Sequence, residues 1–314
     1  MMRAFVFPGQ GAQIIGMGRD LAQTYPAAKA VFEEVDAALG ENLSGLIWEG
    51  DIETLTLTVN AQPALMAVSI AALRALETEG VTVQAAASYV AGHSLGEYSA
   101  LAAAGTLPIA DAARLLRARG AAMQAAVPVG AGAMAALLGL DFEAVEAVAE
   151  EAAQGEVCQA ANDNDPAQTV VSGHKSAVER AIAIAKSKGA KRAVLLPVSA
   201  PFHCALMQPA AEVMAKELRD VNMQAPRVPV VPNVLAAACE DPASLRRLLI
   251  EQVTHAVRWR ESVIWMVHQG VDEIWEIGAG RALSGMVRRI SRDVTTRTVG
   301  TAEDVRTAAA AFAG

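Results

Sequence analysis

Short apolar runs alternate with segments whose apolar residues recur at helical spacing over the first 126 residues. This pattern predicts two strands and four helices: strands at 4–7 and 85–91, and helices at 26–39, 63–77, from Gly96 to near Ala104, and at 111–126. Gly40 stands where the helix at 26–39 must end. The order of strand, glycine-containing loop and helix is typical of an α/β fold.

The middle of the chain has a different pattern. The segment Gly130-Ala131-Gly132 suggests a boundary. After it the pattern predicts, in order, β, α, β, β, α and β elements at 134–140, 142–153, 157–161, 168–172, 175–188 and 192–196. This is the split βαβ order of a ferredoxin-like module.

The α/β pattern then resumes. Further elements are predicted at 228–231 (strand), 244–252 and 261–268 (helices), 273–277 (strand) and 283–290 (helix). We therefore expect a large α/β domain made of residues 1–128 and 199–314. A ferredoxin-like small domain, residues 129–198, is inserted into it.

Composition narrows the classes of protein. Apolar residues make up 53% of the 314 residues, and the net charge is −8. These values argue against disorder and against a nucleic-acid binder that relies on overall positive charge. We expect no membrane span, no signal peptide and a cytoplasmic location, because no apolar run is long enough. The three cysteines are widely spaced, so neither a disulfide framework nor a metal site is expected.

The segment Gly92-His93-Ser94-Leu95-Gly96 matches G-x-S-x-G between a predicted strand and a predicted helix. Small neighbours let such a tight turn project its serine. The start of the following helix also offers free N–H groups to a developing negative charge. Ser94 is therefore a candidate nucleophile, and the alternative is an ordinary glycine-rich turn.

A serine nucleophile needs a base. The chain offers five histidines: His93, His174, His203, His255 and His268. His93 adjoins the serine, so its ring is expected to point elsewhere. His203 lies where the chain re-enters the large domain, which suits a residue of a cleft. The alternative for each histidine is a structural role. Nothing near Cys204 favours a reactive thiolate.

The first glycine loop, residues 7–13, does not match a phosphate-binding loop. A G-x-G-x-x-G pattern would need glycine in place of Ile14, and no Gly-Lys-Ser/Thr follows. One N–H group of this loop and that of Leu95 could instead form an oxyanion hole. The alternative is a plain turn.

Arg119 is predicted to face the core. On the helix at 111–126 it lies in the middle of the face that carries Leu115, Leu116 and Met123, and no carboxylate lies one turn away. A buried guanidinium needs an anion, either a distant carboxylate or a ligand. Its planar fork suits a carboxylate.

A basic cluster stands out in this acidic chain. It consists of Lys186, Lys188, Lys191 and Arg192. Cations at a helix C-terminus are commonly a solvated end of that helix. The alternative is a docking patch for an acidic partner.

The chain resembles the malonyl-CoA:acyl carrier protein transacylase family, the acyltransferases of bacterial fatty acid synthesis. The resemblance rests on motifs spread over the whole chain, in family order: Pro8-Gly9-Gln10-Gly11-Ala12-Gln13, Gln62-Pro63-Ala64-Leu65, Gly92-His93-Ser94-Leu95-Gly96-Glu97-Tyr98-Ser99-Ala100-Leu101, Arg119-Gly120, Pro201-Phe202-His203-Cys204, and Gln252 ahead of Val257-Arg258-Trp259. It implies an α/β-hydrolase-like large domain with a ferredoxin-like insertion.

The resemblance also implies roles for single residues. Ser94 matches the nucleophile and His203 the base, and the N–H groups of Gln10 and Leu95 match the oxyanion hole. It implies further that Arg119 binds the malonyl carboxylate, that the main-chain carbonyl of Gln252 orients the histidine, and that Gln62 and Asn162 line the site. Phe202, a bulky residue before the base, favours malonyl over methylmalonyl units.

The implied reaction moves a malonyl group from coenzyme A to the phosphopantetheine thiol of acyl carrier protein through a malonyl-serine, without a cofactor. Lys191 and Arg192 are the candidate docking residues for the carrier protein. Two alternatives remain at this point. A G-x-S-x-G esterase or thioesterase would share the serine and histidine, and a catalytically silent interaction module would use neither.

Overall fold

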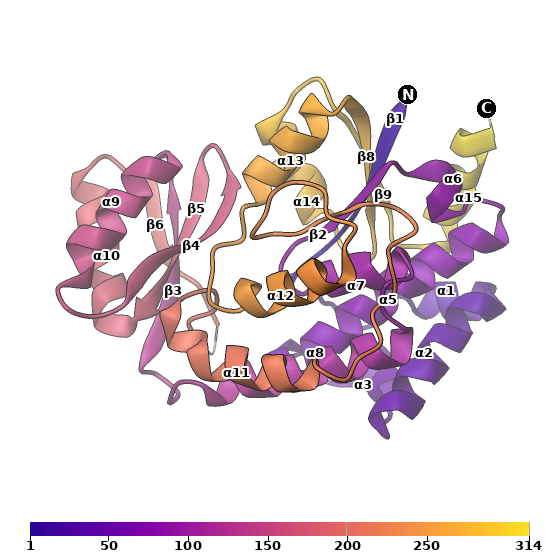
Figure 1. The fold of residues 1–314 in the computed structure, drawn as a ribbon, viewed down its shortest axis with the longest axis horizontal. Coiled ribbons are helices and arrows are strands. Elements are labelled where there is room, and N and C mark those ends of the chain that lie inside the picture. The colour runs from indigo at the N-terminus through magenta and orange to yellow at the C-terminus, as the bar shows by residue number, and fades with distance from the viewer. Residues whose placement is uncertain (199, 314) are drawn as a thin grey trace.

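Two separate β-sheets organise the chain (Figure 1). The computed structural model describes residues 1–198 and 200–313. Two residues lie outside the described ones. They are Ser199, at which we placed a domain boundary, and Gly314, the last residue of the sequence. The fold is a mixed α/β arrangement in which one sheet is parallel and the other is antiparallel.

The first sheet is parallel and has the order β7-β2-β1-β8-β9. Its strands are β7 (Val230–Val231), β2 (Tyr89–Gly92), β1 (Met2–Phe7), β8 (Val271–Ile277) and β9 (Thr295–Val299). Helices cover both faces, as a parallel sheet requires. The carboxyl ends of β1, β2 and β7 lie next to one another, and ligands commonly bind at such ends.

Alternation along β1 explains the two layers. Phe5 and Phe7 belong to the larger core cluster, and Ala4 and Val6 belong to a second cluster on the opposite face. All four side chains are fully buried. A strand with both faces covered is apolar throughout, which is why the run at 4–7 shows no polar residue.

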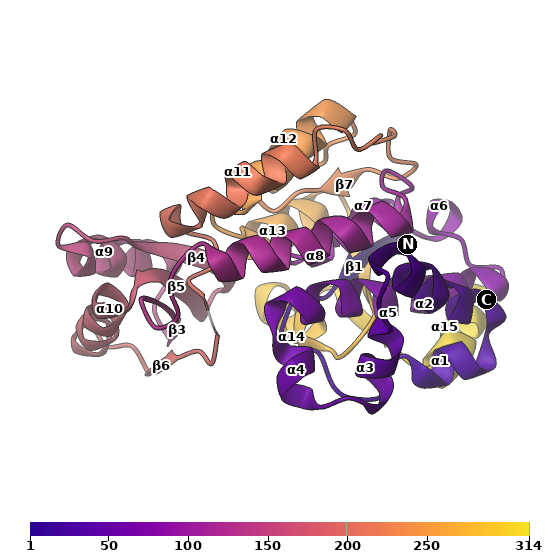
Figure 2. The ribbon, with the colours of Figure 1, turned by 90° about the horizontal axis from the view of Figure 1, so that it is seen from below.

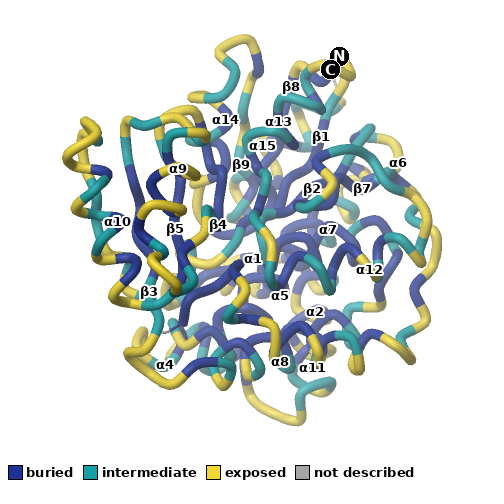
Figure 3. The backbone as a smooth tube through the Cα atoms, turned by 60° about the vertical axis from the view of Figure 1, so that its left-hand side comes forward, coloured by how far each residue is buried: buried dark blue, intermediate teal, exposed yellow. Residues whose placement is uncertain are grey.

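The helices that share the Phe5 side of the sheet form the larger layer. They are α1 (Arg19–Thr24), α2 (Pro26–Leu39), α3 (Leu43–Glu49), α4 (Ile52–Thr56), α5 (Thr58–Thr78), α6 (Val83–Ala86), α7 (Gly96–Ala103), α8 (Ile109–Ala125), α11 (Gln208–Glu217), α12 (Pro242–Gln252) and α15 (Ala302–Ala313). The other face carries α13 (Trp259–His268) and α14 (Ala282–Ile290). Strands β1, β2 and β7 and helix α7 lie largely in the buried interior (Figure 3).

The second sheet is antiparallel and has the order β4-β5-β3-β6. Its elements are β3 (Gly132–Leu138), α9 (Phe142–Ala153), β4 (Cys158–Asp165), β5 (Gln168–His174), α10 (Lys175–Ser187) and β6 (Arg192–Leu195). The helices α9 and α10 cover one face. The other face of the second sheet carries Met134, Ala136 and Val170, which pack into the large core. The second sheet therefore forms one wall of the space between the two sheets.

Strand β4 joins the second sheet to the rest of the chain. Arg260 on α13 pairs with Asp163, and Arg289 on α14 pairs with Asp165, at 2.9 and 2.8 Å. The backbone of Val257 also exchanges hydrogen bonds with β4. Figure 2 shows α8 running from the parallel sheet toward the second sheet, with α11 beside it.

Most elements expected from the pattern are present. The helices at 26–39 and 142–153 have the predicted bounds, and Gly40 ends the first with φ 65°. The strand predicted at 85–91 is wrong in its first half, because α6 occupies Val83–Ala86 and β2 begins at Tyr89. Alanines favour a helix, and a short apolar run does not distinguish the two states.

The helix predicted at 63–77 begins five residues earlier, so that Pro63 lies inside α5. By length and composition α5 could cross a membrane, but 83% of its most apolar window is buried among the other helices. The pattern also missed several elements: η1 (Ala205–Met207), α1, α3, α4, α11, β9 and α15. Most are short, and β9 is mostly polar, with the sequence Thr-Thr-Arg-Thr-Val, rather than an apolar run.

Candidate active site

Ser94 lies in a strained turn between β2 and α7. Its φ is 54°, a left-handed conformation that costs free energy in residues other than glycine. The two flanking glycines are sterically required. A Cβ on Gly92 would lie 1.9 Å from the carbonyl oxygen of Gly96, and a Cβ on Gly96 would lie 2.2 Å from that of Phe7. The turn therefore projects Ser94 beyond the carboxyl end of the sheet, as the G-x-S-x-G spacing predicts.

Asn233, which follows β7, holds this turn on both sides. Its Oδ1 accepts a hydrogen bond from the N–H of Ser94 (2.7 Å), and its Nδ2 donates to the carbonyl of Gly92 (2.6 Å). Asn233 is fully buried. The sequence analysis missed it, because only the parallel sheet brings the end of β7 beside the end of β2.

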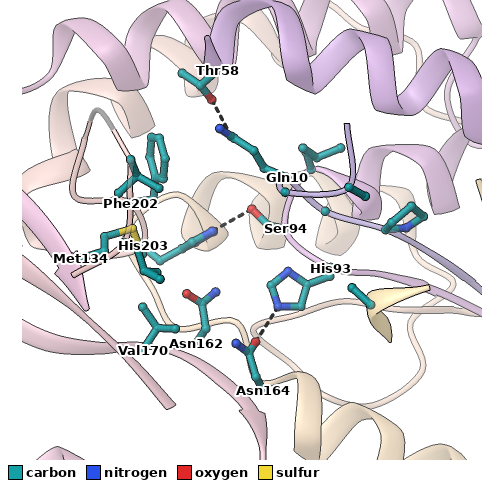
Figure 4. Close-up of a pocket in the computed structure, with 18 of the residues that line it drawn as sticks. Gln10, Thr58, His93, Ser94, Met134, Asn162, Asn164, Val170, Phe202 and His203 are labelled. Atoms are coloured by element: carbon teal, nitrogen blue, oxygen red, sulfur yellow. Dashed lines mark hydrogen bonds between the residues drawn. The ribbon is translucent and has the colours of Figure 1, made fainter. Parts of the chain in front are cut away.

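His203 lies against the serine (Figure 4). Its Nε2 is 2.8 Å from Ser94 Oγ, and its Nδ1 is 2.8 Å from the main-chain carbonyl of Gln252. A carbonyl only accepts, so Nδ1 carries the ring proton and Nε2 is free to accept the serine proton. His203 has φ 58°, so both partners of this pair have a left-handed backbone.

The electrostatic surroundings keep His203 neutral. Burial, and next the positive charge of Arg119, lower the pKa of His203 to about 3. The hydrogen bond to Gln252 opposes this shift. At neutral pH the imidazole is therefore in the form that can accept a proton.

His93 turns away from the serine. Its Nε2 is 2.8 Å from Asn164 Oδ1 on β4 (Figure 4). Its ring packs edge-on against Trp259. Burial lowers the pKa of His93, so it too is neutral. Of the five histidines, all of which the structure describes, only His93 and His203 line the cavity at Ser94.

Arg119 faces inward, as its position on α8 predicts, and is only 1% exposed. Its guanidinium donates to Gln62 Oε1 (2.7 Å), Gln252 Oε1 (2.8 Å) and Ser94 Oγ (3.2 Å). Within residues 1–198 and 200–313, no carboxylate forms an ion pair with it. Its partners are neutral amides and the serine, so a ligand anion could still be accommodated.

Gln252 connects the whole constellation. Besides the carbonyl that holds His203, its side-chain Nε2 donates to the carbonyl of Ser94 (3.0 Å) and to Glu97 Oε2 (2.8 Å). The sequence analysis expected only the main-chain role and did not single out Glu97. Glu97 lies in the first turn of α7, three residues after Ser94. This spacing was the signal by which the sequence could have indicated that Glu97 lies near the site.

The loop after β1 supplies Gln10. Its Oε1 accepts from the hydroxyl of Thr58 (3.0 Å), which itself accepts from Gln62 (2.9 Å), so the loop is anchored on α5. Among the described residues, neither the N–H of Gln10 nor that of Leu95 donates a hydrogen bond within the protein. Both remain available to an oxyanion.

A cavity of about 490 Å³ opens at Ser94 between the two sheets. It is lined by Ser94 and His203 and, from the second sheet, by Met134, Asn162 and Val170 (Figure 4). The lining is mainly apolar. Such a cavity with a few convergent polar groups is typical of a small-molecule site.

The comparisons with known proteins agree with this geometry. The family model described as Acyl transferase domain matches residues 4–247. The chain belongs to this acyltransferase family. The malonyl CoA-acyl carrier protein transacylase of Escherichia coli K12 is 48% identical over 292 residues, 93% of this chain and 94% of the relative. That of Bacillus subtilis is 47% identical over 306 residues, 97% and 95%.

Solved structures agree as well. The acyl-carrier-protein-S-malonyltransferase of Bartonella henselae has a TM-score of 0.98 and 55% identity, with all of both chains covered. A malonyl-transacylase in complex with its type II PKS acyl-carrier protein has a TM-score of 0.96 and 42% identity, covering 99% of this chain and all of that one. The resemblance inferred from the motifs is thereby confirmed.

The remaining candidates of this acyltransferase lie as follows. Phe202 lines the cavity, whereas Cys204 is fully buried, burial raises its thiol pKa, and its Sγ donates to the carbonyl of Pro201. A protonated buried thiol is a poor nucleophile. Of the four basic residues at 186–192, none lines the cavity, and Lys188 pairs with Glu151 (2.7 Å). Lys191 and Arg192 are exposed.

Proposed function

We propose that this acyltransferase moves a malonyl group from coenzyme A to the phosphopantetheine thiol of acyl carrier protein, through a malonyl ester of Ser94. The observation that carries the proposal is Arg119, a guanidinium 1% exposed whose Nη2 is 3.2 Å from Ser94 Oγ. A buried cation without an ionic partner favours an acyl group that brings a carboxylate. The printed names of the relatives support the same substrates.

In the first half-reaction His203 removes the proton of Ser94 through Nε2, and Oγ attacks the thioester carbonyl. The N–H groups of Gln10 and Leu95 stabilise the oxyanion. The tetrahedral intermediate then expels coenzyme A, whose sulfur takes the proton from His203. Arg119 holds the malonyl carboxylate throughout.

In the second half-reaction the carrier thiol gives its proton to His203 and attacks the malonyl ester. The intermediate collapses, Ser94 regains its proton, and malonyl-carrier protein leaves. The carbonyl of Gln252 keeps the imidazole oriented in both halves, so no triad carboxylate is needed. Gln62 and Asn162 complete the lining of the site.

Trapping the intermediate tests this reaction. Radiolabelled malonyl-CoA alone should label Ser94, and added holo-carrier protein should remove the label as malonyl-carrier protein. In Ser94→Ala no label should form. Label that survives in Ser94→Ala would identify another nucleophile. Rapid hydrolysis without a thiol acceptor would favour an esterase or thioesterase, and failure of a serine-directed fluorophosphonate to label Ser94 would favour a silent interaction module.

We further propose that the carrier protein docks at Lys191 and Arg192, which are exposed at the start of β6. Charge complementarity favours the encounter of such a basic patch with an acidic partner. We place the reaction in fatty acid biosynthesis in the cytoplasm. The same chemistry would serve polyketide synthesis, to which one relative's carrier protein belongs.

The finer description of the fold is also a proposal. The large part, residues 1–128 and 199–314, would be an α/β-hydrolase-like domain, because a nucleophile turn follows a parallel strand. Residues 129–198 would be a ferredoxin-like domain. The βαββαβ order and the sheet order β4-β5-β3-β6 support that assignment.

A further inference from the structure

Glu97 is a buried carboxylate that the reaction above does not use. It is fully buried on α7, one turn after Ser94. Its Oε2 accepts hydrogen bonds from the N–H of Asn233 (2.9 Å) and from Gln252 Nε2 (2.8 Å). Its Oε1 has no partner among the described residues. Burying a charge in this way is costly, so its position beside the active site needs a reason.

The side-chain amide of Gln252 connects Glu97 to Arg119. Gln252 Nε2 donates to Glu97, and Gln252 Oε1 accepts from Arg119 Nη2 (2.8 Å). An amide donates only through nitrogen and accepts only through oxygen. The reversed amide would place its NH₂ against the guanidinium and its oxygen against the carboxylate. The two charges therefore fix the amide, and Glu97 is the anion nearest to Arg119 along this path.

We propose that Glu97 is a specificity-determining positioning residue: through Gln252 its carboxylate partly balances the charge of Arg119 and so limits how tightly the site holds the carboxylate of an acyl substrate. This inference rests on the proposed function. A site that transfers its acyl group onward must also release it, and a fully unbalanced buried guanidinium would retain a carboxylate strongly in the ground state.

The substitution Glu97→Gln isolates the charge. Glutamine has the same shape, and its Oε1 can accept both hydrogen bonds that Glu97 Oε2 now accepts. The negative charge is removed, and an NH₂ group takes the place of Glu97 Oε1, which has no partner among the described residues. Arg119 then attracts a ligand carboxylate more strongly, so the preference for malonyl-CoA over acetyl-CoA should increase by roughly 3- to 30-fold.

Calorimetric binding in a Ser94→Ala background measures this preference without turnover. The ratio of the acetyl-CoA to the malonyl-CoA dissociation constant should rise in Ser94→Ala/Glu97→Gln. An unchanged or smaller ratio would overturn the proposal. Glu276→Gln is the matched control, because Glu276 is equally buried but holds the N–H groups of Leu283 and Ser284 at the start of α14. It should leave the ratio as it is.

A double-mutant cycle separates an effect through Arg119 from a structural one. In an Arg119→Ala background, Glu97→Gln should no longer change the ratio, because the cation on which it acts is gone. A purely structural role of Glu97 would weaken both ligands equally in either background. A change of the ratio that persists without Arg119 would contradict the proposal.

A pH titration tests the proposal with Glu97 unchanged, in case Glu97→Gln does not fold. Burial raises the pKa of Glu97 to about 7. The charged or titratable groups that act on it are Arg119 on α8 and Tyr98 beside it. On the other elements packed against α7, Arg3 of β1 pairs with Glu273. Arg74 of α5 pairs with Glu77.

Glu97 is neutral below this pKa and negative above it, so the malonyl preference of Ser94→Ala should fall several-fold from pH 6 to pH 8.5. Titration of the coenzyme A phosphates does not affect this ratio, because acetyl-CoA and malonyl-CoA carry the same phosphates. A flat ratio would overturn the proposal. If instead Ser94→Ala shows no malonyl preference at any pH, the proposed function itself fails. If Ser94→Ala prefers malonyl-CoA but neither pH nor Glu97→Gln changes that preference, only this inference fails and the proposed function stands.

Discussion

At the scale of single residues, the site depends on a few buried polar side chains whose partners are neutral. Arg119 bonds to two amides and a hydroxyl, and His203 bonds to a carbonyl and a hydroxyl. Neutral partners leave the cation without a direct ion pair and the imidazole uncharged. Both properties favour a reaction that brings its own anion and needs a base at neutral pH.

Replacing Arg119 with alanine should impair malonyl transfer selectively. A charged bidentate hydrogen bond contributes roughly 1.5–3 kcal/mol, so kcat/KM for malonyl-CoA should fall about 10- to 150-fold, while relative activity with acetyl-CoA rises. Steady-state kinetics with both thioesters measure this. Arg114→Ala, an exposed arginine on the same helix paired with Asp111, is the control. An unchanged malonyl to acetyl ratio would refute the assigned role.

The pH dependence of Ser94 reactivity should reveal the lowered pKa of His203. An imidazole with pKa near 6.5 would be about tenfold less available as a base at pH 5.5 than at pH 8. Because burial and Arg119 lower the pKa of His203 to about 3, it stays neutral across that range. The rate of Ser94 modification by a neutral fluorophosphonate should therefore change less than about twofold. An inflection near pH 6.5 would contradict this.

At the scale of elements, the turn between β2 and α7 is set by steric exclusion. Gly92 and Gly96 approach backbone atoms so closely that no side chain fits, and Asn233 fastens the turn from the neighbouring strand end. Together these contacts keep Ser94 at φ 54°. Sequence spacing identifies the glycines, whereas the contacts explain why they are needed.

Gly96→Ala should therefore destabilise the protein and disable its serine. The new Cβ would lie 2.2 Å from the carbonyl oxygen of Phe7, and backbone cannot move aside cheaply. We expect a loss of about 3 kcal/mol or more in the free energy of unfolding, and loss of fluorophosphonate labelling. Gly285→Ala on α14 is the control, since its Cβ would meet only the end of Arg289, at 3.6 Å, and should stabilise by up to about 1 kcal/mol. Equal unfolding free energies for the two variants would argue against the steric explanation.

At the scale of the whole molecule, the cavity exists because two sheets face each other across Ser94. Strand β4 supplies Asn162 and Asn164 to the cavity, and its buried Asp163 and Asp165 pair with arginines of α13 and α14. Alternate residues of one strand thus serve the site and the junction. The exposed Lys191 and Arg192, at the start of β6, do not line the cavity.

Reversing the charges of Lys191 and Arg192 to glutamate should raise KM for carrier protein and leave KM for malonyl-CoA unchanged. Charge reversal in a docking surface weakens encounter with an acidic partner, and added salt should reduce the difference. The control reverses Lys29 and Arg306, exposed cations of α2 and α15, for the same change in net charge. If both pairs have equal effects, Lys191 and Arg192 are only solvent-exposed residues at the start of β6 and do not form a docking site.

The sequence by itself identified Ser94 and Arg119 as candidate site residues and located most elements. Tight turns require particular glycines, and helical spacing places Arg119 among Leu115, Leu116 and Met123, so local rules suffice for Ser94 and for that inward cation. The family motifs added His203, Gln10 and Gln252. Only the tertiary structure decided what Glu97, Asn233 and Asn164 do, because their partners lie 71 to 155 residues away. Such hydrogen bonds follow from the order of strands in a sheet and the meeting of two sheets, and no local pattern encodes them.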